Sequence, residues 1–346
     1  MTLNSTLAPA NRQQAFPTGW FLVCFSDELA AGQVKSLQWM GLEVVAFRTE
    51  AGRPCLSDAF CPHMGAHFGH GGTIEGETLR CPFHGFCFDT RGTCVKTGYD
   101  TRPPRKAKLR TWPVHETNGL LLAYHGRDAA APEWTVPKLD EEGWTPLRHD
   151  TWALPGTPYD VARRTVGFDH LSTHLSIAPD TAMPELLDAV HTEGPKLSAS
   201  YAANRRVGGL LRRKGIRTEF RLTKWGLGYS CLEVEMPELG VCSRHFVFAS
   251  ATDEDSVRLG VAVSLRHVDR PTKASALFRL LPRRLLHRLV VGAPLRDYRD
   301  DVSKYFEGGV DEAGRAGLGE AGLDFQEWAR QFGGSTGRDA TISAAE

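Results

Sequence analysis

Two short stretches, each with one cysteine and one histidine, constrain this chain more than any other feature. They are Cys61-Pro-His63 and Cys81-Pro-Phe-His84, with 17 residues between His63 and Cys81. A zinc finger usually takes two Cys from one turn and two His from another. Because each turn here brings one of each, the pattern favours two adjacent metals, one with both thiolates and one with both imidazoles.

That arrangement is the ligand set of a Rieske [2Fe–2S] cluster, in which neutral imidazoles on one iron raise the reduction potential. The neighbouring glycines permit tight turns that aim backbone N–H groups at sulfur. Two alternatives stay open on the residues alone, a Cys2His2 zinc site and four unrelated residues. The other cysteines are interpreted as core, strand or packing residues: Cys24, Cys55, Cys87, Cys94, Cys231 and Cys242.

Charge and hydropathy exclude several classes of function. The 346 residues contain 41 basic and 41 acidic side chains, which argues against nucleic acid as the main partner. No apolar run approaches the roughly 20 residues that span a bilayer. The polar start has no apolar signal-peptide core, so we expect a cytoplasmic protein without a transmembrane segment.

Strand and turn signals divide the chain. Residues 17–125 contain short β-rich runs at 20–25, 42–49, 54–60, 78–83 and 86–90, and Asn118-Gly119 predicts a hairpin. We expect an N-terminal arm over 1–16, an all-β domain over 17–125 and a Pro- and charge-rich connector over 126–150.

The second half has a different pattern. It predicts helices over 160–175, 183–194, 272–292 and 323–332, and strands over 216–225, 229–236, 242–251 and 256–268. Residues 151–332 should therefore form a helix-flanked antiparallel sheet, followed by a disordered tail over 333–346. With the predicted cluster, the fold class is α+β, an N-terminal all-β Rieske [2Fe–2S] domain plus a C-terminal helix-flanked antiparallel β-sheet of the helix-grip-like kind.

The stretch from Cys61 to Cys94 resembles the Rieske domain of the Rieske non-heme iron oxygenases, in the group around aminopyrrolnitrin oxygenase, 3-ketosteroid 9α-hydroxylase and cholesterol 7-desaturase. The family's cluster ligands fall on Cys61, His63, Cys81 and His84. Met64 stands where the family often has Arg.

The resemblance also implies a mononuclear Fe(II) held by two His and one carboxylate, with open positions for O2 and substrate. His170 and His174 are four residues apart, so on a helix both project from one face. Asp301, followed by Val302, matches the family's carboxylate, with Asp297 and Asp300 as alternatives. A solvated histidine pair and a charged surface turn are the simpler interpretations.

The iron-site motif departs from the family's Glu-Asn-x-x-Asp-x-x-His. Arg163 and Arg164 replace Glu and Asn, and Gly167 replaces the Asp that carries electrons between subunits in the family. Asp169 would point about 200° away from position 167 on a helix. The family's usual electron route therefore lacks its carboxylate in this chain.

The resemblance implies an enzyme, a cytoplasmic oxygenase that acts as a homotrimer. An NAD(P)H-dependent reductase, with or without a ferredoxin, would supply electrons, and O2 would be the cosubstrate. The substrate would be an apolar or natural-product small molecule that is hydroxylated, demethylated or desaturated. The alternative is an electron-transfer or regulatory homologue with an intact cluster and a degenerate iron site.

Overall fold

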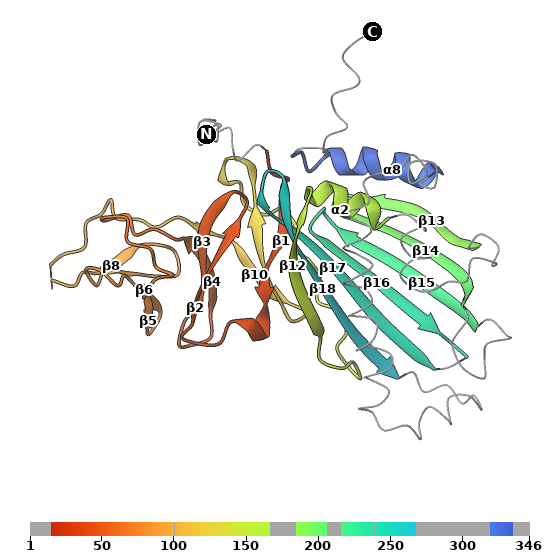
Figure 1. Ribbon diagram of the computed structural model, residues 1–346, viewed down its shortest axis with the longest axis horizontal. Helices are drawn as coiled ribbons and strands as arrows, with labels where there is room; N and C mark the ends of the chain where they lie inside the picture. The colour runs from red at the N-terminus through yellow and green to blue at the C-terminus, as the bar shows by residue number, and fades with distance from the viewer. Residues whose placement is uncertain are drawn as a thin grey trace, which may run out of the picture. The chain divides into compact units, whose positions relative to one another are not determined.

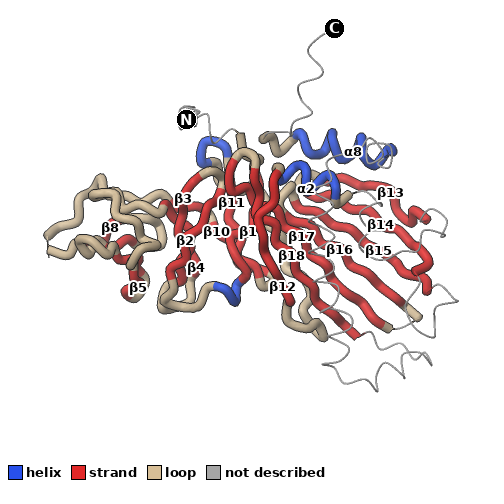
Figure 2. The backbone as a smooth tube through the Cα atoms, in the orientation of Figure 1, coloured by secondary structure: helices blue, strands red, loops and turns tan. Residues whose placement is uncertain are grey.

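The computed structural model describes residues 15–99, 101–166, 185–205, 216–238, 240–267 and 319–334. The chain divides into two compact units. The first comprises Met1–Leu139 with Ser250–Ser256, and the second comprises Asp140–Ala249 with Val257–Glu346. Strands dominate both (Figure 1 and Figure 2).

The first unit contains three antiparallel sheets. Their strand orders are β1-β11-β10, β2-β3-β4-β9 and β5-β6-β7-β8. The strands are β1 (Gly19–Phe25), β2 (Val34–Trp39), β3 (Leu42–Arg48), β4 (Pro54–Asp58), β5 (Thr73–Glu75), β6 (Thr78–Arg80), β7 (Cys87–Phe88), β8 (Cys94–Lys96), β9 (Thr111–Trp112), β10 (Val114–Thr117) and β11 (Leu120–His125). Two 3₁₀ turns, η1 (Ser26–Glu28) and η2 (Arg127–Ala129), follow β1 and β11.

The predicted hairpin at Asn118-Gly119 is confirmed. It joins β10 to β11, and Asn118 and Gly119 both have positive φ, 55° and 75°. Two successive left-handed residues match a type I′ turn, whose twist suits adjacent antiparallel strands. Asn118 also donates to the Pro137 carbonyl and accepts from the Leu139 amide, which holds the following segment against the turn.

The second unit is built on one seven-stranded antiparallel sheet in the order β12-β18-β17-β16-β15-β14-β13. Its strands are β12 (Arg148–Pro155), β13 (Glu185–Glu193), β14 (Lys196–Arg205), β15 (Ile216–Trp225), β16 (Tyr229–Met236), β17 (Val241–Asp253) and β18 (Ser256–His267). Four of these strands confirm the sequence prediction closely, because a long run of alternating apolar residues is specific for a strand with one buried face.

Two helices of the second unit are described, α2 (Pro158–Arg164) and α8 (Gly319–Arg330). Helix α2 begins at a capping box in which Thr157 and Asp160 satisfy each other's backbone N–H groups. Helix α8 packs against α2 and β13 (Figure 1). The indole of Trp328 donates to the Gly194 carbonyl at 3.0 Å, which holds α8 on the β13–β14 turn.

Two parts of the secondary-structure prediction need correction. The predicted helix over 183–194 is wrong, because Glu185–Glu193 form the edge strand β13, paired with β14 from Glu185↔Ala202 to Glu193↔Lys196. Leu187 and Val190 are three residues apart, as on one face of a helix, but the backbone finds partners on β14, which local propensity cannot reveal. The sequence prediction also omits β2, β5, β8, β9, β12 and β14.

The structure describes the predicted helix over 160–175 only as far as Val166. Within that part, α2 ends at Arg164. The predicted helix over 272–292 lies outside the described residues. Most of the arm over 1–16 and of the tail over 333–346 also lies outside them.

Candidate metal centre

The first Cys-His turn is a closed loop after β4. The Cys61 N–H donates to the Ala66 carbonyl at 2.8 Å, and the Gly65 N–H donates back to the Cys61 carbonyl at 2.9 Å. Gly65 has φ of 72°, where an L side chain would be strained. The loop buries the Cys61 side chain and leaves His63 exposed.

The second turn, between β6 and β7, has the same construction. The Cys81 N–H donates to the Phe86 carbonyl at 2.8 Å, and the Gly85 N–H donates to the Cys81 carbonyl at 3.1 Å. Gly85 has φ of 62°. The two loops therefore present equivalent cysteines on equivalent backbones, and this repetition confirms that Gly65 and Gly85 serve tight turns.

The loops bring like ligands together. Burial and, to a smaller extent, the adjacent Cys81 thiol raise the pKa of the Cys61 thiol to about 11. The backbone N–H groups of His63 and Met64 act against this by hydrogen bonding to the Cys61 sulfur. The rings of His63 and His84 lie with centroids 4.8 Å apart at 78°. Two thiols are thus paired inside and two imidazoles are paired at the surface.

This donor set fits a two-iron cluster better than one metal ion. Protonated buried thiols become ligands when a cation replaces their protons. Separate sulfur and nitrogen pairs match a Rieske cluster, in which one iron takes two Cys and the other takes two His. The two pairs match the donor types that such a cluster uses, and no group of three or more metal-binding side chains gathers at one point among the described residues.

Several supporting residues were not singled out from the sequence. The Gly98 N–H donates to the His84 carbonyl at 3.1 Å, and a Cβ at Gly98 would lie 2.2 Å from that oxygen. Phe86 stacks on His63 at 4.4 Å, and Tyr99 lies 6.0 Å from His84, both between ring centroids. Two features of the sequence could have indicated these residues, namely the aromatic Phe86 two positions after His84 and the Gly98-Tyr99 pair.

The residues predicted to bind the mononuclear iron lie outside the described part of the chain. These are His170, His174 and Asp301, with the alternatives Asp297 and Asp300. Gly167 and Asp169, which concern the electron route, also lie outside it.

One buried cation lies near the described end of that region. Lys224 of β15 is 1% exposed, and its amine donates to the Thr165 hydroxyl at 2.6 Å and to the Ser230 hydroxyl. Thr165 ends α2 and donates to the Val161 and Ala162 carbonyls at 2.9 and 3.1 Å. Burial lowers the pKa of Lys224 to about 7. This residue fixes the C-terminus of α2 on the sheet.

Fold and site together define an iron–sulfur electron-transfer domain joined to a sheet-based second unit. Residues 19–113 match the family model of the Rieske [2Fe-2S] domain. The first unit therefore contains a Rieske domain.

Curated relatives match part of the chain. Cholesterol 7-desaturase nvd 1 of Ciona intestinalis is 39% identical over 126 residues, which are 36% of this chain and 27% of the relative. The oxygenase component of 3-ketosteroid-9-alpha-monooxygenase from Rhodococcus rhodochrous is 29% identical over 146 residues, 42% of this chain and 38% of the relative. The matches thus span well under half of the relatives' length.

Solved structures resemble the whole chain. The terminal oxygenase of carbazole 1,9a-dioxygenase from Nocardioides aromaticivorans IC177 has a TM-score of 0.62 at 15% identity, covering 94% of this chain and 97% of that one. The reduced complex between oxygenase and ferredoxin in carbazole 1,9a-dioxygenase has a TM-score of 0.57 at 16% identity, covering 93% and 86%. The chain therefore has the fold of Rieske oxygenase α-subunits, which confirms the predicted fold class. Within the described residues, no helix is long and apolar enough to cross a bilayer.

Proposed function

We propose that this chain is a Rieske-type oxygenase that uses O2 and NAD(P)H-derived electrons to oxidise an apolar small molecule. The single observation that carries the proposal is the pair of matching ligand loops, which place two thiols together and two imidazoles together. The whole-chain likeness to terminal oxygenases supports a function beyond that of an isolated electron carrier.

In this proposal, Cys61, His63, Cys81 and His84 hold the [2Fe–2S] cluster, which supplies one-electron transfer when bound. The protein contributes burial on the thiol side and exposure on the imidazole side. Backbone N–H groups at His63 and Met64 stabilise the charged sulfur. Electrons should therefore enter and leave at the histidine edge.

His170, His174 and Asp301 are the proposed ligands of the mononuclear Fe(II), which supplies O2 activation when bound. Within the described chain, α2 leads into this segment, and Lys224 holds the last turn of α2 through Thr165. The proposed role of Lys224 and Thr165 is to hold the C-terminal end of α2 in place.

Steroids are the first substrates to test, because two relatives are named cholesterol 7-desaturase and 3-ketosteroid-9-alpha-monooxygenase. Hydroxylation, desaturation and demethylation are the candidate reactions. The proposal includes an NAD(P)H-dependent reductase, a ferredoxin as an intermediate carrier, a homotrimer and a cytoplasmic location. The oxygenase–ferredoxin complex among the structural neighbours supports the ferredoxin.

Metal analysis tests the proposal directly. Wild-type protein should contain about three irons per chain and show a rhombic Rieske EPR signal with nitrogen couplings when reduced. Asp301→Ala should lower the iron to about two per chain and abolish steroid oxidation, with the EPR signal unchanged. Asp297→Ala and Asp300→Ala are the matched controls. If Asp301→Ala kept its full iron content and one of the controls lost iron, the third ligand would be the residue replaced in that control.

A second function is favoured by the charges on α2. Arg163 and Arg164 occupy the positions where the family has Glu and Asn. An electron-transfer or regulatory homologue would keep the cluster without a working mononuclear site. About two irons per chain, together with a normal Rieske EPR signal and no oxidation product, would establish this alternative.

A further inference from the structure

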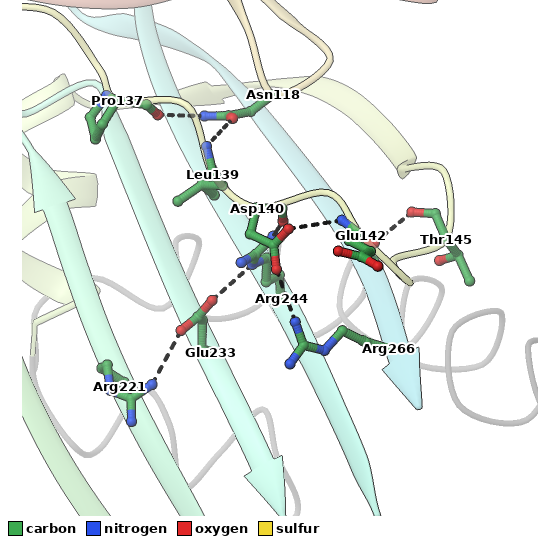
Figure 3. A network of polar contacts seen from close by, with 11 residues as sticks. Asn118, Pro137, Leu139, Asp140, Glu142, Thr145, Arg221, Glu233, Arg244 and Arg266 are labelled. Atoms are coloured by element: carbon green, nitrogen blue, oxygen red, sulfur yellow. Dashed lines mark hydrogen bonds and ion pairs between the residues drawn. The ribbon is translucent and has the colours of Figure 1, made fainter. Parts of the chain in front are cut away.

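The central strands of the large sheet present two different faces. Strands β15, β16 and β17 pair without a register shift, so alternate residues project from opposite sides of the sheet. The ion pairs of Arg221, Glu233 and Arg244 lie on one side (Figure 3). The positions between them form the other side, which we call the inner face. Its apolar residues on β15 and β16 are buried, namely Phe220, Leu222, Leu232 and Val234.

Two polar side chains of β17 interrupt this inner face. Ser243 is in register with Val234, and His245 is in register with Leu232. Because Ser243 and His245 are two residues apart on one strand, both project from the inner face, and Ser243 Oγ lies 2.9 Å from His245 Nε2. Polar groups among apolar neighbours cost free energy that an apolar pair would avoid. The pair therefore indicates a role beyond packing.

The inner face is less tightly covered at this pair than elsewhere. His245 and Val247 are half-buried, whereas Phe220, Leu222 and Val234 are at most 3% exposed. The imidazole therefore borders open space, although its strand neighbours on β16 and β15 are enclosed. A mainly apolar surface with a few placed polar groups is the usual lining of a small-molecule site.

Lys224 is a second polar group on the inner face, but its position is closed. It pairs with Ser230, and Ser230 pairs with Val247, so Lys224 lies in the row next to that of His245. The Lys224 amine is enclosed by the hydroxyls of Thr165 and Ser230, and the residue is 1% exposed. Lys224 therefore anchors α2, and the Ser243–His245 pair is the one of the two that a ligand can reach.

Helix α2 also indicates which face is the substrate side. Its C-terminal Thr165 reaches Lys224, so the chain leaves α2 on the inner-face side of the sheet. The proposed iron ligands His170 and His174 follow α2 in the chain. A substrate of the proposed oxygenase would therefore be held on the inner face.

We propose that the Ser243–His245 pair hydrogen-bonds an oxygen substituent of the apolar substrate, and so selects hydroxylated or keto compounds over bare hydrocarbons. This inference rests on the proposed function, because it takes the inner face as the substrate side. It assigns the pair a part in specificity and no part in the chemistry at iron.

The donor and acceptor capacity of the pair decides which oxygen substituents fit. A hydroxyl has one donor and two acceptor positions, and the contact with His245 occupies one of the three on Ser243. If the imidazole donates to Ser243, the hydroxyl proton can serve a ketone or an alcohol. If Ser243 donates to the imidazole, its oxygen can accept from an alcohol. An alcohol is thus served by either tautomer, and a hydrocarbon by neither.

The test is equilibrium dialysis of the iron-loaded full chain with three steroids of one skeleton, androstan-3-ol, androstan-3-one and androstane. The wild-type protein should bind androstan-3-ol at least about tenfold more tightly than androstane, since one net hydrogen bond supplies a difference of this size. Ser243→Ala/His245→Phe should bring the two affinities within about twofold, because androstane binding does not use the pair.

Two further variants separate specificity from stability. Ser230→Ala is the matched control, because it removes another buried hydroxyl of the inner face, and it should keep the tenfold preference. His245→Gln retains a donor and an acceptor and should keep a preference of about fivefold. Ser243→Ala alone removes a single oxygen atom, and its loss of preference carries the test if the double variant does not fold.

The same preference in wild type and in Ser243→Ala/His245→Phe would overturn the inference, as would its loss in Ser230→Ala. Failure of the wild-type protein to bind any of the three steroids would overturn it too. Dialysis needs no electron supply and no turnover. Selective binding without oxidation would keep the inference and remove the oxygenase, whereas oxidation of androstane and androstan-3-ol with equal kcat/KM would keep the oxygenase and remove the inference.

Discussion

At the scale of single residues, Lys224 is the clearest case of a group whose environment changes its chemistry. Its described partners are the hydroxyls of Thr165 and Ser230. Burial lowers its pKa to about 7 from 10.5. The unfolded chain therefore binds more protons between these values, so stability rises with pH across this window. The penalty is complete below about pH 7 and is on the order of a few kcal/mol.

Lys224→Met should remove this pH dependence. The variant should be more stable than wild type near pH 6, and its advantage should shrink as the pH rises from about 7 toward 10.5. The measurement is the difference in thermal midpoint between the two proteins at several pH values. Lys196→Met, on the adjacent strand and partly exposed, serves as the control and should show no such trend. If the difference in thermal midpoint between Lys224→Met and wild type stayed constant over this pH range, the lowered pKa of the Lys224 amine would be contradicted.

At the scale of elements, a polar network joins the connector to three strands of the large sheet (Figure 3). Glu233 of β16 accepts from Arg244 of β17 at 2.8 Å and from Arg221 of β15 at 3.3 Å. Arg244 also donates to the Asp140 carbonyl and lies 3.9 Å from the Trp144 ring centroid. The connector is therefore ordered where it meets these strands.

The two arginines that share Glu233 should differ in energy. The Arg244 side chain is 10% exposed and the Arg221 side chain is 60% exposed. Arg244→Ala should cost about 2–4 kcal/mol, because the Asp140 carbonyl loses this donor and the partly buried Glu233 carboxylate keeps only the exposed Arg221. Arg221→Ala should cost less than about 1 kcal/mol. Chemical denaturation measures the free energy of unfolding of both variants. Equal losses would show that the burial of the arginine does not determine the contribution of its ion pair.

At the scale of the whole molecule, sequence order and structural units do not coincide. The turn between β17 and β18 belongs to the first unit, although both strands build the sheet of the second. The Ser250 hydroxyl donates to the Leu22 carbonyl at 2.8 Å, and the Met40 N–H donates to the Ala251 carbonyl at 2.8 Å. Ala251 lies in the same hydrophobic cluster as Trp39.

Ala251→Asp should therefore destabilise the Rieske unit, although the residue lies more than a hundred positions beyond that domain in sequence. An uncompensated carboxylate at a site 1% exposed should cost about 3–5 kcal/mol. The visible absorbance of the cluster should disappear at a lower temperature. Glu254→Ala, at the exposed tip of the same turn, should leave this temperature unchanged. Cluster loss at the wild-type temperature in Ala251→Asp would contradict this division of the chain.

The sequence by itself predicted the features that depend on local patterns. The strands β15 and β16 follow from strict alternation, and the β10–β11 turn follows from Asn118-Gly119, because these signals act over a few residues. The assignment of the cluster ligands stays a prediction, and it rests on a related kind of signal. Two Cys-His turns match few other metal sites, and in the structure the two thiols lie near each other, as do the two imidazoles.

Only the tertiary structure decided features that depend on distant partners. Strand β13 has helix-like spacing and became a strand because β14 offered its backbone hydrogen bonds. Burial lowers the pKa of Lys224, and the amine is buried beside Thr165 and Ser230, neither of which is adjacent to it in sequence. The support of His84 by Gly98 depends on a close approach between two loops. The local sequence pattern determines which residues can bind metal or pair as strands. Burial and long-range contacts determine the surroundings of those residues, because desolvation and hydrogen bonding between distant segments arise only when those segments pack together.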